Sequence, residues 1–261
     1  MVQCLGDSSI PVRNAAASAI SAIAEIELPI GLWDSLFTDL QSLIENSSVD
    51  VGSRVACIEV VRYICEDLQN MDDSMAAVIL NMLLNCFQSS QPMEIWLEAI
   101  QALSSALFFG DSFMQDTNQC NRVMQAVLDA CQSSSLDVQC HAFDCLTNVF
   151  DYFYRLINPY FDTFYTVCEH AVMSEVGQLS IQASLTLSTL FEVELAQEHQ
   201  GGEVFGLCQR CGDKLAEVLC MVMVKQDEND TGETMTPPAA AAKCMRSLAE
   251  ILRNGRRSRR V

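Results

Sequence analysis

A set of three apolar residues, spaced four positions apart, occurs six times along this chain of 261 residues. Each set begins with an alanine. The sets are Ala16, Ile20 and Ala24; Ala56, Val60 and Ile64; Ala99, Leu103 and Leu107; Ala142, Leu146 and Phe150; Ala183, Leu187 and Phe191; and Ala241, Met245 and Ala249. Because positions i, i+4 and i+8 form one stripe of an α-helix, each set predicts a helix that buries this stripe.

The first alanines of successive sets are separated by 40, 43, 43, 41 and 58 residues. A second apolar segment lies between the stripes, as in MAAVILNMLLNCF at residues 75–87. A repeat of two helices over about 40–47 residues is typical of HEAT and armadillo arrays, whose stacked pairs share a continuous core. We therefore expect an all-α fold, a HEAT-repeat α-solenoid in which about eleven helices form antiparallel pairs in a right-handed superhelix.

The charge balance bears on the class of partner. The chain has 15 basic and 34 acidic residues, a net charge of −19, and its 13 cysteines lie within apolar helical patterns. Proteins that bind nucleic acid usually carry the opposite sign, so we expect basic protein partners and no nucleic acid. Without a signal peptide or an apolar run long enough to span a membrane, we expect reduced, buried thiols and no membrane insertion.

The sequence contains no convincing motif for a catalytic or metal site. The three histidines, His141, His170 and His199, are far apart, and CQRC contains one Cys208–Cys211 pair with no second pair. Structural zinc needs four ligands, and a redox pair needs a thioredoxin-like context. There is also no phosphate-binding GxxxxGK[ST] loop and no nucleophile elbow. We therefore expect no enzymatic activity, no cofactor and no metal.

Three stretches follow one another at characteristic distances: EIELPIGLW at residues 25–33, YICEDL at 63–68 and KQDEND at 225–230. In this order they resemble the N-terminal HEAT-repeat region of the importin-β (karyopherin-β) family of nuclear import receptors. The resemblance is continuous from about Glu25 to Met245 and implies a fragment that covers about repeats three to eight. It also implies that the striped helices form the inner, concave layer and that the helices between them form the outer layer.

The same resemblance suggests a domain plan. Residues 1–254 would form about five to six HEAT repeats with an acidic loop at 225–236, and residues 255–261 would form a disordered basic tail. In the family, this loop contacts Ran carrying GTP and basic cargo or its adaptor, importin-α. The loop acids here are Asp227, Glu228, Asp230 and Glu233. From the residues alone, an ordinary solvated turn is the favoured interpretation of this passage.

A second implied site lies on the outer helices, where the family binds phenylalanines of nucleoporin FG repeats. Leu80, Asn81 and Leu84 match one wall of such a groove, and Val123 matches part of the other. Arg122 departs from the pattern, because the family has an aromatic or apolar residue there. A groove requires Leu80 and Leu84 to be partly exposed, whereas ordinary packing between repeats would bury them.

The resemblance implies a nuclear transport receptor segment that binds Ran–GTP, FG nucleoporins and import cargo or adaptor. Such a protein works in the cytoplasm, in the nucleus and at the pore complexes of the nuclear envelope. The alternative is a generic HEAT-repeat scaffold, such as a phosphatase or kinase regulatory subunit. A scaffold of that kind would show neither FG binding nor a preference for one Ran nucleotide state.

Overall fold

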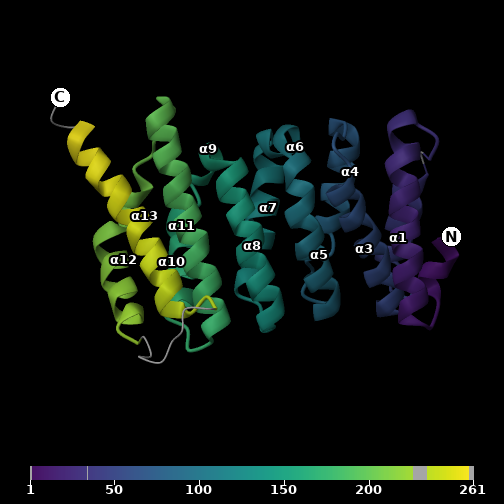
Figure 1. Ribbon diagram of the computed structural model, residues 1–261. Coiled ribbons are helices and arrows are strands. Elements are labelled where there is room, and N and C mark those ends of the chain that lie inside the picture. The colour runs from purple at the N-terminus through teal and green to yellow at the C-terminus, as the bar shows by residue number, and fades with distance from the viewer. Residues whose placement is uncertain (1, 34, 226–233, 259–261) are drawn as a thin grey trace. The chain divides into compact units, whose positions relative to one another are not determined.

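The structure is a computed structural model that describes residues 2–33, 35–225 and 234–258, with side chains up to Arg253. Within these ranges the chain forms thirteen α-helices and three short 3-10 helices, and no strand (Figure 1). The all-α prediction is confirmed, and the two helices beyond the expected eleven, α6 and α9, have only five and four residues. None of the described helices is both long and apolar enough to cross a membrane.

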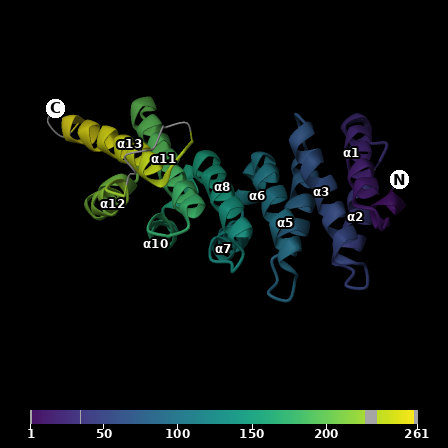
Figure 2. The same cartoon turned by 60° about the horizontal axis from the view of Figure 1, so that its bottom comes forward.

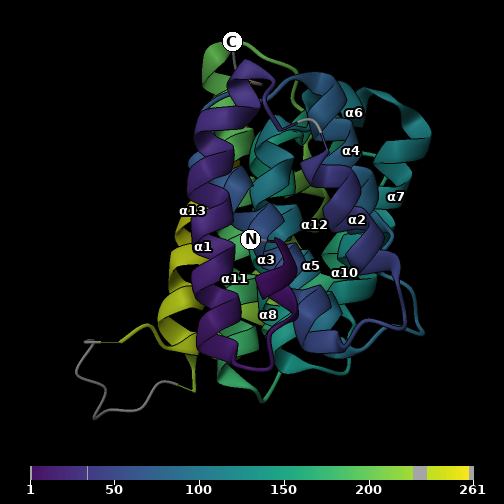
Figure 3. The same cartoon turned by 90° about the vertical axis from the view of Figure 1, so that its right-hand side faces the viewer.

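Contacts divide the chain into two compact units, Met1–Ala130 and Cys131–Val261. Unit 1 contains η1 (Val2–Gly6), α1 (Ile10–Glu27), η2 (Leu28–Ile30), α2 (Leu36–Glu45), α3 (Val51–Asp67), α4 (Asp73–Leu84), α5 (Met93–Ala106), η3 (Leu107–Phe109), α6 (Asp111–Gln115) and α7 (Thr117–Cys131), whose last residue belongs to unit 2. Helices α1, α3 and α5 pack side by side, while α2 and α4 cover α3 and α5 (Figure 3). We call the layer with the stripes the B layer and the other the A layer, because the A helix comes first in each pair.

Unit 2 repeats this two-layer arrangement. It contains α8 (Leu136–Tyr152), α9 (Tyr154–Ile157), α10 (Phe161–Val172), α11 (Gly177–Gln200), α12 (Leu207–Met223) and α13 (Pro237–Ser258). Helices α8, α11 and α13 form the B layer, and α10 and α12 lie together on one side of α11 and α13 as the A layer (Figure 2).

The predicted stripes are buried in five of the six helices. The sixth prediction is wrong, because Met245 is half-buried and Ala249 is exposed. The buried stripe of α13 is instead Ala240, Cys244 and Leu248, each no more than 1% exposed. The first residue of this stripe is one of four consecutive alanines, residues 239–242, so the sequence pattern does not show which of them faces the core.

Helix ends follow local chemistry. The Asp50 carboxylate accepts a hydrogen bond from the Ser53 amide at 3.0 Å, which caps α3, and bonds from the Ser53 hydroxyl and amide lower the pKa of Asp50. Helix α13 begins at Pro237, as expected for a residue without an amide hydrogen. The same helix continues to Ser258, so the backbone of residues 255–258 is helical, and residues 259–261 lie outside the described part.

A buried carboxylate organises the A–B junction of unit 2. Glu194 of α11 has no exposed surface, and its oxygens accept bonds from the amides of Leu207 and Cys208 at 2.7 and 2.9 Å. It also accepts a bond from the Tyr154 hydroxyl at 3.1 Å, and this hydroxyl in turn accepts one from the Phe205 amide. Glu194 therefore caps the first turn of α12 from a neighbouring helix, where a negative charge is favoured.

Replacing Glu194 by alanine should lower the free energy of unfolding by about 3–5 kcal/mol, because three donors would lose their buried acceptor. Glu194→Gln, which keeps one acceptor oxygen, should cost less. Urea unfolding followed by circular dichroism measures both changes. The matched control is Glu203→Ala, since Glu203 is exposed. Equal losses for Glu194→Ala and Glu203→Ala would contradict this role.

Candidate functional site

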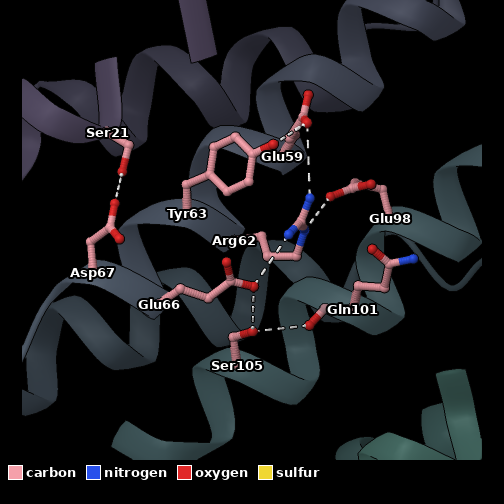
Figure 4. A network of polar contacts seen from close by, with 9 residues as sticks. All are labelled: Ser21, Glu59, Arg62, Tyr63, Glu66, Asp67, Glu98, Gln101 and Ser105. Carbon is pink, nitrogen blue, oxygen red and sulfur yellow. Dashed lines mark hydrogen bonds and ion pairs between the residues drawn. The ribbon is translucent and has the colours of Figure 1, made fainter. Parts of the chain in front are cut away.

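The B-layer helices of unit 1 carry a network of polar side chains (Figure 4). On α3, Glu59, Arg62 and Glu66 recur at spacings of three and four residues, so they lie on one stripe of the helix. We call the whole set the B-face network, and it consists of Ser21, Glu59, Arg62, Tyr63, Glu66, Asp67, Glu98, Gln101 and Ser105. The sequence analysis did not identify it.

Arg62 is the centre of this network. Its Nε lies 2.7 Å from Glu98 Oε1 on α5, and its Nη1 lies 3.2 Å from Glu66 Oε1 on α3. Its Nη2 is 3.9 Å from Glu59 Oε1, and the guanidinium carbon lies 4.7 Å from the centroid of the Tyr63 ring. One arginine thus holds three carboxylates and connects neighbouring B helices.

Glu98 depends on this arrangement most strongly. Its side chain is only 14% exposed, compared with 44% for Glu66. Burial raises the pKa of Glu98, and the hydrogen bond and charge of Arg62 act in the opposite direction. The ionised form of Glu98 is therefore sustained by Arg62.

Hydroxyl groups add two further links in the B layer of unit 1. The Ser21 hydroxyl of α1 donates to Asp67 Oδ2 of α3 at 2.8 Å, and the Ser105 hydroxyl of α5 donates to Glu66 Oε1 at 3.3 Å. Each pair of neighbouring B helices in unit 1 is therefore joined by a polar contact. With four carboxylates and one guanidinium, the B-face network has a formal charge of −3.

The B layer of unit 2 is linked mainly through hydroxyl groups. Thr147 of α8 and Thr186 of α11 are 2.9 Å apart, as are the hydroxyls of Ser188 on α11 and Ser247 on α13. Glu192 Oε1 accepts from both serines at 3.0 Å. Polar links between adjacent B helices thus occur in both units, but the arginine-centred cluster is found in unit 1.

The expected acidic loop falls mostly on residues that the structure does not describe. Asp227, Glu228, Asp230 and Glu233 all lie outside the described ranges. Its described ends are Lys225, after α12, and residues 234–236, before α13. The Lys225 Nζ lies 3.4 Å from Glu175 Oε1.

The apolar side chains that were expected to line a groove on the A layer are buried. Leu80 and Val123 have no exposed surface, and Leu84 is 8% exposed, so their burial agrees with ordinary packing, the second of the two alternatives. These side chains face the packed interior of unit 1, as an apolar stripe of a helix generally does. Asn81 is half-buried and is the wall residue with a polar contact to α7.

That contact comes from Arg122, which bridges α7 and α4. Its Nη1 donates to Asn81 Oδ1 at 2.6 Å and to Gln119 Oε1 at 2.7 Å, and its Nη2 donates to Asn85 Oδ1 at 3.2 Å. Sequence reasoning identified Arg122 as a departure from the family, but it missed Asn85. The available signal was the four-residue spacing of the two asparagines on a predicted helix.

The described part of the chain shows neither a group of side chains that could hold a metal ion nor a reactive pair of thiols at Cys208 and Cys211. No three histidine, cysteine, aspartate or glutamate side chains there are grouped so that they could hold a metal ion. Cys208 and Cys211 are both buried in α12, and burial raises the pKa of Cys211 to about 12. Burial and the Glu194 carboxylate raise the pKa of Cys208 as well, which disfavours a reactive thiolate.

The pair formed by Arg62 and Glu98 should show a coupling energy of about 1–2 kcal/mol in a double-mutant cycle of alanine variants, measured by urea unfolding at pH 7. Arg62→Ala alone should cost less stability at pH 4 than at pH 7. Without Arg62, the raised pKa of Glu98 lets this carboxyl take up a proton as the pH falls, which removes the buried charge.

The control is a second cycle on Lys214 and Glu169, whose Nζ and Oε2 are 2.6 Å apart while the lysine side chain is 69% exposed. Because water screens this pair, its coupling should stay below about 0.5 kcal/mol. Couplings of the same size in the two cycles would contradict a special role for Arg62.

Comparison with known proteins places the chain in a family. The family model described as IPO5-like, TPR repeats matches residues 7–167, which is more than half of the chain. Importin subunit beta-1 of Saccharomyces cerevisiae is 26% identical over 255 residues, which cover 92% of this chain and 29% of the relative. The chain thus spans less than a third of the length of that relative.

Solved structures show the same fold. A Kap95:Nup1 complex matches with a TM-score of 0.87 at 23% identity, over 95% of this chain and 30% of that chain. A second solved structure gives the same TM-score, identity and coverage. Its description is "Kap95p Binding Induces the Switch Loops of RanGDP to adopt the GTP-bound Conformation". The likeness confirms the α-solenoid fold. The chain belongs to the IPO5-like family of TPR repeats, and its resemblance to importin-β is confirmed.

Proposed function

We propose that the chain is a nuclear transport receptor segment that supports protein import into the nucleus. It binds Ran–GTP, FG-repeat nucleoporins and a basic cargo or the adaptor importin-α, reversibly and without chemistry of its own. It works in the cytoplasm, in the nucleus and at nuclear pore complexes. Support comes from its family and from relatives whose structures are described with Nup1 and with RanGDP.

The observation that carries the proposal is the acidic B-face network of unit 1. Its charge of −3 lies on helices α3 and α5, with Glu66 and Asp67 exposed. Exposed carboxylates on one face attract a basic protein surface over several ångströms and orient its approach. The net charge of −19 for the whole chain acts in the same direction.

The acidic passage at 225–236 is the second proposed contact for Ran and basic cargo. Its acids are Asp227, Glu228, Asp230 and Glu233, and they follow the last turn of an A helix in unit 2. Each exposed ion pair contributes only about 0–1 kcal/mol, so the passage would act mainly on the rate of association.

The FG-repeat contact is proposed for the A layer. Leu80, Asn81, Leu84 and Val123 remain the predicted walls of the groove, although the three apolar side chains are buried. Binding there therefore requires α4 and α7 to separate locally or a side chain at their rim to move.

Capture of Ran–GTP should depend on both acidic surfaces at low ionic strength. Replacing the four loop acids by Asn and Gln, or Glu66 and Asp67 by Gln and Asn, should slow association by about three- to tenfold. In 0.5 M salt the effect should almost vanish, because the screening length falls to about 4 Å. Surface-bound Ran, loaded with GTP or GDP, measures the rates, and GTP should be preferred.

The matched control removes two acids from the A layer of unit 1, with Asp73→Asn and Asp129→Asn, since both residues are exposed. This variant should associate nearly as fast as the parent. A chain that captures neither nucleotide form of Ran and no FG repeats would contradict the proposed function and favour a generic HEAT-repeat scaffold.

A further inference from the structure

We propose that a cavity of unit 1 binds a small carboxylate, with the guanidinium of Arg54 at its inner end and the carboxylate of Glu45 at its rim. The cavity lies where α2 and α4 end and α3 begins, and its volume of about 330 Å³ is within the range of small-molecule sites. The residues that line it include Glu45, Arg54, Asn85, Cys86, Gln88 and Gln91. The site shares no residue with the B-face network and does not depend on the proposed function.

The first support is a buried charge without a counter-ion. Arg54 is 5% exposed, and Glu194 is the only other charged side chain of the described residues that is buried. Arg54 donates from Nε to the Ile44 carbonyl at 2.7 Å and from Nη2 to Gln91 Oε1 at 2.8 Å. Both acceptors are neutral, and within the described ranges the guanidinium forms no ion pair. A buried charge is costly unless it is paired, so an anion that reaches Arg54 would be bound favourably.

The second support is the number of donors that remain on this side chain. A guanidinium carries five N–H groups in one plane, and the two bonds above use two of them. Nη1 of Arg54 has no hydrogen-bond partner among the described residues, so its two N–H groups are available to the cavity that Arg54 lines. A carboxylate can accept two parallel N–H bonds from one guanidinium, which makes it the best-matched acceptor for this fork.

Helix capping accounts for only part of the arrangement. The Ile44 carbonyl is one of the last four of α2, which have no partner within the helix, and Nε of Arg54 supplies its bond. The other repeats do without such an arginine. Two positions before the first alanine of the other four confirmed stripes, the residues are Asn14, Leu97, Cys140 and Ile181. The repeat fold therefore does not require an arginine at this place.

The rim of the cavity determines which anion fits. Glu45 is exposed, and its Oε1 accepts bonds from Gln41 Nε2 at 2.9 Å and from Asn85 Nδ2 at 3.2 Å. Burial raises the pKa of the Cys86 thiol to about 12, while the charge of Arg54 lowers this pKa and that of Glu45 raises it, so both charges act on the same wall. A dianion such as phosphate would be repelled by Glu45. A single carboxylate suits the cavity, and an amino group beside it would pair with Glu45.

Trp96 provides a reporter for this cavity. Its Nε1 donates to the backbone oxygen of Gln88, a lining residue, at 3.1 Å, and Trp33 is the only other tryptophan and serves as the internal reference. Two-dimensional NMR of the isotope-labelled full chain follows the indole N–H resonance of Trp96 as a probe is added, against sodium chloride at equal ionic strength. Acetate, glycine and N-acetylglycine should each shift it saturably, and phosphate should bind about threefold or more weakly than acetate.

Two variants test the roles of the charges. Arg54→Lys keeps the charge but removes the planar fork, so it should weaken acetate binding by about tenfold or more. Glu45→Gln should strengthen the binding of acetate and N-acetylglycine by about threefold and reduce the preference for glycine, because it removes the negative charge at the rim. The matched control is Glu25→Gln, since Glu25 is an exposed acid of α1 and the change in net charge is the same. It should leave the affinities unchanged.

Circular dichroism establishes that each variant is folded, and the exposed Glu45 gives a test even if Arg54→Lys does not fold. Tighter binding of glycine than of N-acetylglycine indicates a free amino acid as the source of the carboxylate, and the reverse indicates the carboxyl end of a peptide; either result supports the site. The proposal is overturned if no carboxylate probe shifts the Trp96 resonance saturably or if phosphate binds as tightly as acetate. Unchanged acetate binding by folded Arg54→Lys, or equal effects of Glu45→Gln and Glu25→Gln, would overturn it as well.

Discussion

Close packing of neighbouring B helices, which bury their alanine stripes, is the contact on which the rest of each unit depends. The first alanine of each of the five confirmed stripes is no more than 7% exposed. Because neighbouring B helices pack directly against each other, polar residues of one helix meet those of the next across the interface. The 2.7 Å contact of Arg62 with Glu98 and the 2.9 Å contact of Thr147 with Thr186 both connect neighbouring B helices. The polar face is therefore a consequence of how the apolar face packs.

Much of the fold could be predicted from the sequence. The four-residue spacing of apolar residues such as Ala56, Val60 and Ile64 indicates a helix without knowledge of the rest of the structure. The register of α13 was not, because four consecutive alanines give the same local pattern in several registers. The B-face network was harder still. Ser21 and Asp67 are 46 residues apart in sequence, and only the three-dimensional packing of α1 and α3 shows that they meet. Whether Leu84 is exposed or buried could not be decided from the sequence, because a pattern of leucines is the same for a groove wall and for a core.

The two layers of unit 1 offer different chemistry to a partner. The B face has carboxylates in excess, and a central arginine keeps the least exposed of them ionised. On the A face, an arginine and amides cover the rim above apolar side chains. A basic protein surface suits the B face, while the rim of the A face offers a guanidinium and amides that are already paired with each other. Because the two layers of unit 1 present different residues, two classes of partner could bind this unit without competing for the same residues.

The central claim is that the acidic B face receives a basic partner whose state is set by its nucleotide. Hydrogen exchange of the chain, measured by mass spectrometry with Ran–GTP and with Ran–GDP, tests this claim most directly. The account predicts slower exchange in α3 and α5 with Ran–GTP, a much smaller change with Ran–GDP, and little change in α4. Equal protection with both nucleotides, or protection confined to the A-layer helices, would contradict it.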